Sequence, residues 1–310
     1  MIKQFNFPTT MWLLSIGCLL TTFLSSCDEN SFSQVVKVEI PEHEPKVAMS
    51  ALWLSADTTA YVHIDKSKAI LDEENTPLPT DAVVKLFING DFVQEATFSS
   101  SSQSGLPSDQ YTFLDRTISS TAGDEYRLEA TFDNLPVASA TQIMPANVPI
   151  NKVEYIQNGG GTPDGGQTDL FNVTFTDDGA TEDYYMIKLY ILTKHPDWPN
   201  PEDSITEFTS IYLESNDPTV TMARGSLLLS DKSFNGKTVT TKAQSYSWGV
   251  VQSGEAHLIH ITKETYFYLK SIESYYNALD NPFAQPTDVY GNIKDGYGIF
   301  GLGNNSKLEF

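Results

Sequence analysis

Residues 125–132 read EYRLEATF, and this stretch alternates without a fault between apolar and polar side chains. Successive side chains of a β-strand point to opposite faces, so the tyrosine, leucine, alanine and phenylalanine would share one face. A period of two of this kind predicts a strand with one buried and one solvated face, as in an antiparallel sheet. We therefore expect the chain to build its core from β-structure.

Stretches of the same kind surround this strand in the first half of the chain. They cover residues 35–40, 46–54, 59–64, 83–88, 92–98, 111–114 and 135–141. Asn89-Gly90 favours a tight hairpin turn between two of them, because both residue types tolerate positive φ. Seven or eight short strands in about 110 residues are typical of an immunoglobulin-like or transthyretin-like β-sandwich. We predict such a domain over residues 35–145.

A proline-containing break, MPANVP at residues 144–149, precedes a second β-rich half that we predict over residues 146–310. Its expected strands cover residues 152–157, 169–176, 184–192, 207–213, 237–243 and 257–261. Residues 158–166 (NGGGTPDGG) are expected to form a flexible loop, since they are too rich in glycine to pack. The predicted fold class is mainly all-β, with two antiparallel sandwich-like domains.

The sequence period changes from two to between three and four over residues 263–279. Apolar residues recur there at steps of three and four, no glycine or proline interrupts them, and Thr262 can cap the first turn. This pattern predicts one amphipathic helix near the C-terminus. Tyrosine and phenylalanine almost encircle it, which we explain by packing against a sheet in preference to stacking on a ligand.

Residues 1–26 are predicted to be a lipoprotein signal peptide. Lys3 precedes an apolar run at residues 11–24, which is shorter than the roughly 20 residues that a membrane-spanning helix needs. The run ends in LSSC, which has the form of a bacterial lipobox, so Cys27 is predicted to carry lipid on its sulfur. The alternative is an ordinary signal peptide that ends beside a chance cysteine.

Acidic residues follow the predicted lipid directly, within a tether expected at residues 27–34. Asp28 and Glu29 resemble the surface-export signal of Bacteroidota lipoproteins. We therefore expect an outer-membrane protein that is anchored by lipid and faces the extracellular side. A solvated linker is the plainer explanation of the same two residues.

The overall charge excludes most nucleic-acid partners. The chain has 40 Asp and Glu residues against 19 Lys and Arg residues, which gives a formal net charge of −21. A polyanion repels phosphate, whereas nucleic-acid-binding proteins typically carry a basic patch. Cys18 and Cys27 are the two cysteines of the sequence, so the folded part is expected to have neither a disulfide nor thiol chemistry.

The last segment carries a resemblance to a known family. It reads NPF at residues 281–283, GNI at residues 291–293 and GYGIFG at residues 296–301, with Pro286 between the first two. Together with the lipobox, the two β halves and the tyrosine-rich helix, it resembles the Bacteroidota lipoproteins grouped as domain of unknown function 4249. The resemblance implies an outer-membrane lipoprotein, often encoded beside a TonB-dependent transporter. It brings no catalytic residues with it.

Sequence templates for catalysis and for metal binding are not matched. No two of the five histidines are four residues apart, and the nucleophile-elbow, S-x-x-K and Walker patterns do not occur. The acidic pairs at residues 177–178 and 182–183 are expected in solvated loops. They do not match the EF-hand spacing, and weak calcium binding by an acidic loop is left open. We therefore predict no catalytic residue, no metal and no cofactor besides the lipid, with a hydrolase that lacks a recognisable motif as the alternative.

Two aromatic loops of the second half are the candidates for contact with a ligand or a partner. One is stiffened by three prolines, the other is shorter, and their predicted contact residues are His195, Asp197, Trp198, Tyr246 and Trp248. A rigid, exposed aromatic side chain beside carboxylates suits a sugar face, a peptide or a partner protein. The alternative is that each tryptophan folds back onto the sheet as an anchor of its loop.

The leading hypothesis is a surface-exposed outer-membrane lipoprotein that acts as an accessory or ligand-capturing subunit of a TonB-dependent transporter. In this hypothesis the lipid anchors the chain, the acidic β body keeps it soluble, and the aromatic loops contact transporter or cargo. The alternative is a non-catalytic structural module, such as an adhesin or a subunit of an outer-membrane assembly or secretion machine.

Overall fold

The structure is a computed structural model of the chain. It describes residues 42–69, 72, 78–100, 109–114, 117–162, 165–197, 200–246, 249–279, 284–285 and 287–310, with backbone only at residues 200–202. The chain divides into residues 1–43 and residues 44–310, and the fold described below belongs to the second unit. The expected signal peptide, lipidation site, export signal and first strand lie outside the described residues, as do Trp198 and Trp248.

Strands dominate the described residues, which confirms the all-β prediction. They are β1 (Val47–Leu54), β2 (Ala60–Lys66), β3 (Val83–Ile88), β4 (Asp91–Glu95), β5 (Thr97–Ser99), β6 (Gln110–Phe113), β7 (Glu125–Thr131), β8 (Ala138–Ile143), β9 (Ile150–Gly161), β10 (Gln167–Thr176), β11 (Tyr184–Asp197), β12 (Asn200–Ser210), β13 (Thr221–Ala223), β14 (Ser226–Ser230), β15 (Thr238–Ser245), β16 (Val250–Ile261) and β17 (Tyr297–Glu309). In β7, the EYRLEATF stretch, Tyr126, Leu128 and Ala130 are buried as the alternation predicted.

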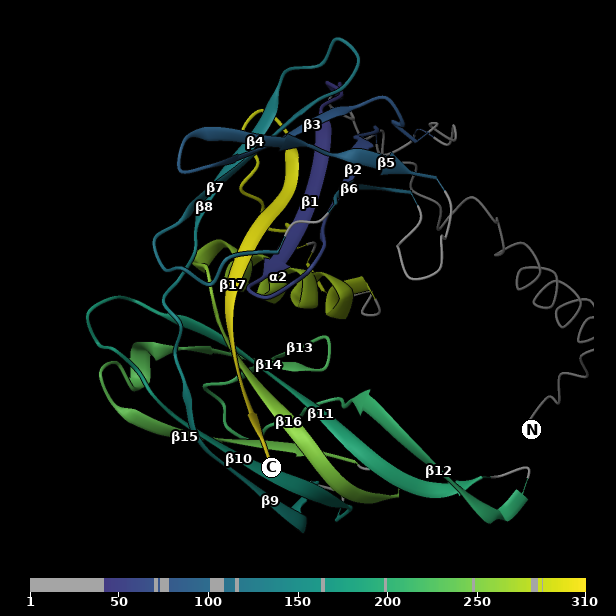
Figure 1. Cartoon of the computed structure of the whole chain (residues 1–310), viewed down its shortest axis with the longest axis vertical. Coiled ribbons are helices and arrows are strands. Elements are labelled where there is room, and N and C mark those ends of the chain that lie inside the picture. The colour runs from purple at the N-terminus through teal and green to yellow at the C-terminus, as the bar shows by residue number, and fades with distance from the viewer. Residues whose placement is uncertain are drawn as a thin grey trace, which may run out of the picture. The chain divides into compact units, whose positions relative to one another are not determined.

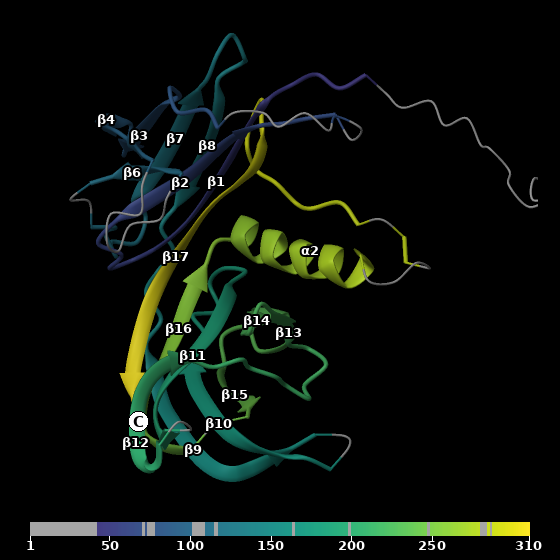
Figure 2. The same cartoon turned by 90° about the vertical axis from the view of Figure 1, so that its right-hand side faces the viewer.

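The strands form three sheets (Figures 1 and 2). The ten-stranded sheet has the order β13-β14-β11-β16-β17-β1-β2-β6-β5, and β12 pairs with β11 beside this path. A four-stranded sheet has the order β4-β3-β7-β8, and a three-stranded sheet has the order β15-β10-β9. Pairing between neighbours is antiparallel in these sheets except between β1 and β17, which run parallel.

The last strand, β17, is shared by the two halves of the sequence. Its first residues pair with β1, from Tyr297 to Gly303, and its later residues pair with β16, from Gly303 to Glu309. In Figure 1 this yellow strand runs from beside β1 to beside β16. The continuation of this strand is hard to see in the sequence, because the residues that follow Leu302 are mostly polar.

Two large hydrophobic cores lie on either side of the predicted boundary at residues 145–146. The first contains residues from β1 to Met144, with Phe300 and Leu302 of β17. At its centre Trp53 is 2% exposed and meets the rings of Phe113 and Phe300 edge-on. The second core gathers side chains between positions 148 and 258, with residue 310 packed against it. The boundary itself stays a prediction, since the ten-stranded sheet continues across it.

The helix α2 (Lys263–Leu279) has the predicted bounds. Tyr266 near its start is buried and lies against Tyr184 with ring centroids 4.7 Å apart, in a small core beside β11 and β14. A β-carbon at Gly301 would collide with the Thr265 hydroxyl, so the glycine permits the close approach of α2 to β17. No helix of the described residues has both the length and the apolar character needed to span a membrane.

Two loop predictions are wrong, and both loops are parts of long hairpins. Residues 158–161 continue β9, and Gly160 pairs with Thr168 of β10, because a backbone ladder needs no large side chains. The expected proline-rich loop from His195 onward belongs to β11 and β12, with Pro196 opposite Ser204. Proline is tolerated there because the pairing of β11 with β16 ends at Lys194, so Pro196 has a strand neighbour on one side only, and irregular pairing follows at Asp197.

Two further strand predictions differ from the structure. The single strand expected at residues 92–98 is divided into β4 and β5 at Ala96, whose amide donates to the Val84 carbonyl at 2.8 Å. The short strands β13 and β14 were not predicted. β14 reads SLLLS and is buried on both faces, so its sequence shows no alternation.

Candidate functional site

A pocket of about 420 Å³ opens over one face of the β11–β12 hairpin. Paired residues form its floor, because cross-strand partners share a face: Ile191 lies opposite Thr209, and Thr193 lies opposite Glu207. His195, Tyr212 and Tyr246 also line it. The structure therefore brings together two predicted contact residues, His195 and Tyr246, that are far apart in the sequence.

The imidazole of His195 is held between the backbone and an acid. Nδ1 lies 3.2 Å from the Pro196 carbonyl oxygen, which can only accept, so Nδ1 carries a proton. Nε2 lies 3.8 Å from a carboxylate oxygen of Glu207. The imidazole and the carboxylate therefore give the pocket two polar groups that can contact a ligand.

The second aromatic loop approaches the hairpin through its backbone. Gly249 has φ +97°, and a β-carbon there would lie 2.6 Å from the Lys194 carbonyl oxygen. The next residue, Val250, pairs with Lys194. The two loops singled out in the sequence are thus neighbours, although Trp198 and Trp248 lie outside the described residues. Asp197 pairs with Asn200 near the hairpin end, away from the pocket lining.

The strand β12 is a sheet edge with two exposed apolar side chains among polar and acidic ones. Among the described strands it pairs with β11 alone, so its other side is a free sheet edge. Ile205 is 43% exposed and Phe208 is 53% exposed, on opposite faces of the strand, and Tyr212 just beyond it is 66% exposed. An edge with unpaired backbone groups and exposed apolar side chains is a ready template for another strand.

A buried acidic cluster forms a second distinctive place in this half. Asp177, Asp183 and Asp231 are 3%, 5% and 1% exposed, and one carboxylate oxygen from each lies within 4.8 Å of the others. The prediction of solvated loops is therefore wrong for Asp177 and Asp183. Oxygen atoms from three acids are a donor set that suits a hard metal ion.

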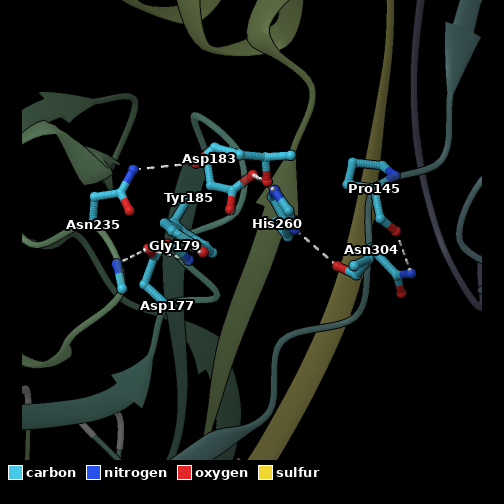
Figure 3. Close-up of polar contacts among 11 residues, drawn as sticks. Pro145, Asp177, Gly179, Asp183, Tyr185, Asn235, His260 and Asn304 are labelled. Atoms are coloured by element: carbon cyan, nitrogen blue, oxygen red, sulfur yellow. Dashed lines mark hydrogen bonds and ion pairs between the residues drawn. The ribbon is translucent and has the colours of Figure 1, made fainter.

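Hydrogen bonds explain why Asp177 is buried (Figure 3). Its carboxylate accepts from the Tyr185 hydroxyl at 2.6 Å, from the Gly236 amide at 2.7 Å and from the Gly179 amide at 3.2 Å. It therefore joins the turn after β10 to the turn before β15. Asp183 accepts from the Thr181 hydroxyl at 2.8 Å.

His260 of β16 connects this cluster to the segment between the two halves (Figure 3). Its Nδ1 lies 2.8 Å from the Ala146 carbonyl oxygen, and its Nε2 lies 3.2 Å from a carboxylate oxygen of Asp183. Beside it, the Asn304 amide donates to the Pro145 carbonyl at 2.8 Å. Side chains of β16 and β17 thus hold the backbone at residues 145–146.

Burial governs the ionisation of the cluster. Desolvation raises the pKa of Asp231, and a hydrogen bond with the Asp183 backbone partly opposes this. The nearby carboxylates of Asp177, Asp183 and Glu182 raise the pKa further. Desolvation, followed by the hydrogen bond to Asp177, also raises the pKa of the Tyr185 phenol. The pKa of Asp231 is therefore higher than that of a solvated aspartate, and a cation nearby would lower it.

Sequence reasoning missed this cluster because its members come from three turns. The Asp231 amide donates to the Asp183 carbonyl at 3.1 Å. This contact continues the pairing of β11 with β14, and β14 was not predicted from the sequence. The available signal was the Asp-Asp-Gly turn at residues 177–179, whose first carboxylate commonly caps nearby amides.

Comparison with known proteins gives one family match. A family model described as a domain of unknown function, DUF4249, matches residues 34–309. The matched residues include every described strand and the helix. A search of the curated proteins finds no match.

Proposed function

The chain belongs to the DUF4249 family, and from this premise we propose that it is a lipid-anchored, non-catalytic binding subunit of the outer membrane that assists a TonB-dependent transporter. Cys27 carries the lipid in this proposal, and Asp28 and Glu29 direct the chain to the outer surface. Stable anchoring takes more than one acyl chain, which the modification of a lipoprotein cysteine supplies.

The observation that supports a binding role is the free edge of β12, which carries the exposed apolar side chains of Ile205 and Phe208. A partner's extended segment can add to such an edge through backbone hydrogen bonds, with side-chain pockets supplying specificity. The pocket on one face of the hairpin, lined by His195, Tyr212 and Tyr246, provides a place for such side chains. Phe208 stacks on Tyr190 on the other face, with ring centroids 5.9 Å apart.

The partner proposed for this edge is an extended segment of the transporter, since a protein strand satisfies both the unpaired backbone and the apolar side chains. Phe208→Glu places a charge in the contact without changing a buried side chain. We expect at least a tenfold loss of the transporter that co-purifies from membranes in mild detergent. Phe92→Glu is the matched control, because Phe92 is also on a strand and is 57% exposed.

The outcomes of this co-purification separate the alternatives. A transporter retained equally by wild type and Phe208→Glu would contradict the role of β12. Recovery of an assembly or secretion component in place of a transporter would favour the structural module. Cys27→Ala serves as the anchor control, and unchanged partitioning of that variant into detergent would contradict the lipid anchor.

A further inference from the structure

The three buried acids converge on one small region. Asp177 follows β10, Asp183 precedes β11, and Asp231 begins the 3-10 helix η1 (Asp231–Ser233). Their nearest carboxylate oxygens are within 4.8 Å of one another. Calcium binds oxygen at 2.3–2.6 Å, so two oxygens on one ion can be as far apart as about 5 Å. Three oxygens at the 4.8 Å limit would lie about 2.8 Å from a common centre, so a shift of a few tenths of an ångström lets a single ion contact all three side chains.

Asp231 supplies an independent observation. Its side chain is 1% exposed, and its Oδ2 atom has no hydrogen-bond partner in the described part of the chain. A buried polar atom without a hydrogen bond lowers the free energy of unfolding, and the loss is greatest when the atom carries charge. The other two acids accept hydrogen bonds from neighbouring groups. Asp231 Oδ2 is the atom that lacks a counterpart.

The surrounding cations do not balance the cluster. In the described part of the chain, the basic group that contacts the cluster is His260, through Asp183. Lys232 and Lys263 pair instead with Glu182 near the surface, at 3.9 Å and 3.6 Å, and their side chains are 73% and 57% exposed. Three carboxylates facing one imidazole leave excess negative charge, and a bound cation would be the largest compensating charge in the site.

We infer that Asp177, Asp183 and Asp231 form a calcium-binding site. The donors are all oxygen, which suits a hard ion, whereas zinc prefers nitrogen and sulfur. Calcium accepts irregular geometry and completes its shell with carbonyl oxygens or water, while magnesium demands a near-ideal octahedron. His260 is a positioning residue for Asp183 and not a ligand, since both its nitrogens already face oxygen atoms.

An open pocket of about 600 Å³ provides a route to the site. Asp183, His260, Thr181 and Asp178 are among its lining residues. Calcium bound there would join the turn at residues 177–183 to η1, and through Asp183 and His260 it would steady the backbone at Ala146. The site thus fixes the segment that connects the two hydrophobic cores. This inference does not depend on the proposed function.

Thermal unfolding of the purified full chain tests the site with calcium alone as the probe. Sites in extracellular modules bind calcium with dissociation constants of about 0.1–1 mM, so about 10 mM calcium chloride is at least roughly tenfold above them. We expect Tm at neutral pH to be about 3 °C or more higher in calcium than in EDTA. An unchanged Tm, together with no heat of calcium binding in titration calorimetry, would overturn the inference.

Asp231→Asn separates a ligand from a structural residue. This variant should lose the calcium-dependent rise in Tm, yet in EDTA it should be at least as stable as wild type, because it removes an unpaired buried charge. Asp178→Asn is the matched control: Asp178 is the exposed neighbour of Asp177, and its variant should keep the full rise. An equal calcium response in Asp231→Asn and wild type would overturn the site.

Should Asp231→Asn fail to fold, calorimetry on wild type still decides. Binding of one calcium per chain, with magnesium at least tenfold weaker, supports the site. Binding that is equal for both ions, or absent, contradicts it.

Discussion

The β12 edge and the acidic cluster lie in the same half of the chain and leave opposite groups unsatisfied. At β12 the backbone edge and apolar side chains such as Phe208 face solvent, whereas at the cluster charged oxygens such as Asp231 Oδ2 are buried. Sequences normally agree with their fold at every level, and local violations are concentrated at functional sites. A protein strand would satisfy the free edge of β12, and a cation would satisfy the buried oxygen of Asp231.

The difference teaches that the two places should respond to different changes. A substitution at the edge removes contacts that exist only in a complex, so it should alter partner retention with little effect on folding. A substitution in the cluster removes contacts that exist in the folded chain itself, so it should alter stability with little effect on partner retention. The predictions below test this separation.

The largest expected effect is that of Asp177→Ala on stability. The substitution leaves the buried Tyr185 hydroxyl and the amides of Gly179 and Gly236 without their acceptor, which we expect to cost about 3 kcal/mol in the free energy of unfolding. Denaturant unfolding measures this cost. Asp178→Ala, at the exposed neighbouring position, should stay within about 0.5 kcal/mol of wild type.

Co-purification of the Asp177→Ala variant with its partner tests whether the cluster is separate from the β12 edge. Asp177→Ala chains that remain folded should co-purify with the same partner as wild type. A loss of partner as large as that of Phe208→Glu would show that the two places are not separate.

A smaller effect is expected from pH in the presence of EDTA. Burial raises the folded pKa of Asp231 above its unfolded value of about 3.9, so the folded state binds more protons in the interval between the two. This contribution to stability is complete below the unfolded pKa and is lost as pH rises through the folded pKa. Each pKa unit of difference corresponds to about 1.4 kcal/mol.

The comparison of wild type with Asp231→Asn isolates this group, since the other acids titrate in both chains. We expect the free energy of unfolding of wild type to fall relative to the variant as pH rises from about 4 through the folded pKa of Asp231. Calcium should remove most of this difference for wild type. A difference that grows towards low pH would contradict the assignment.

Much of the fold was predictable because the hydrophobic period is local information. The alternation in EYRLEATF and the step of three to four after Thr262 are confirmed as β7 and α2. The double pairing of β17 was not predictable, since a strand's partners depend on register between distant segments and Asn304, although polar, is fully buried there.

The candidate sites were predictable to different degrees. His195 and Tyr246 were singled out as aromatic or polar residues in loops, and the structure brings them to one pocket. The loop expected at His195 is in fact part of a hairpin, because backbone pairing outweighed the prolines. The cluster was missed because acidic residues in turns are usually solvated, and only the contact of Asp231 with Asp183 reveals their burial.

The most direct measurement is hydrogen–deuterium exchange of the backbone amides, recorded for the chain alone, with calcium, and in the complex recovered from mild detergent. We predict that calcium protects amides near residues 177–183 and 231–236 but not those of β12. The complex should protect β12 but add no protection at the cluster beyond that given by calcium. Protection of both places by either addition, or of neither place, would contradict the separation of the two sites.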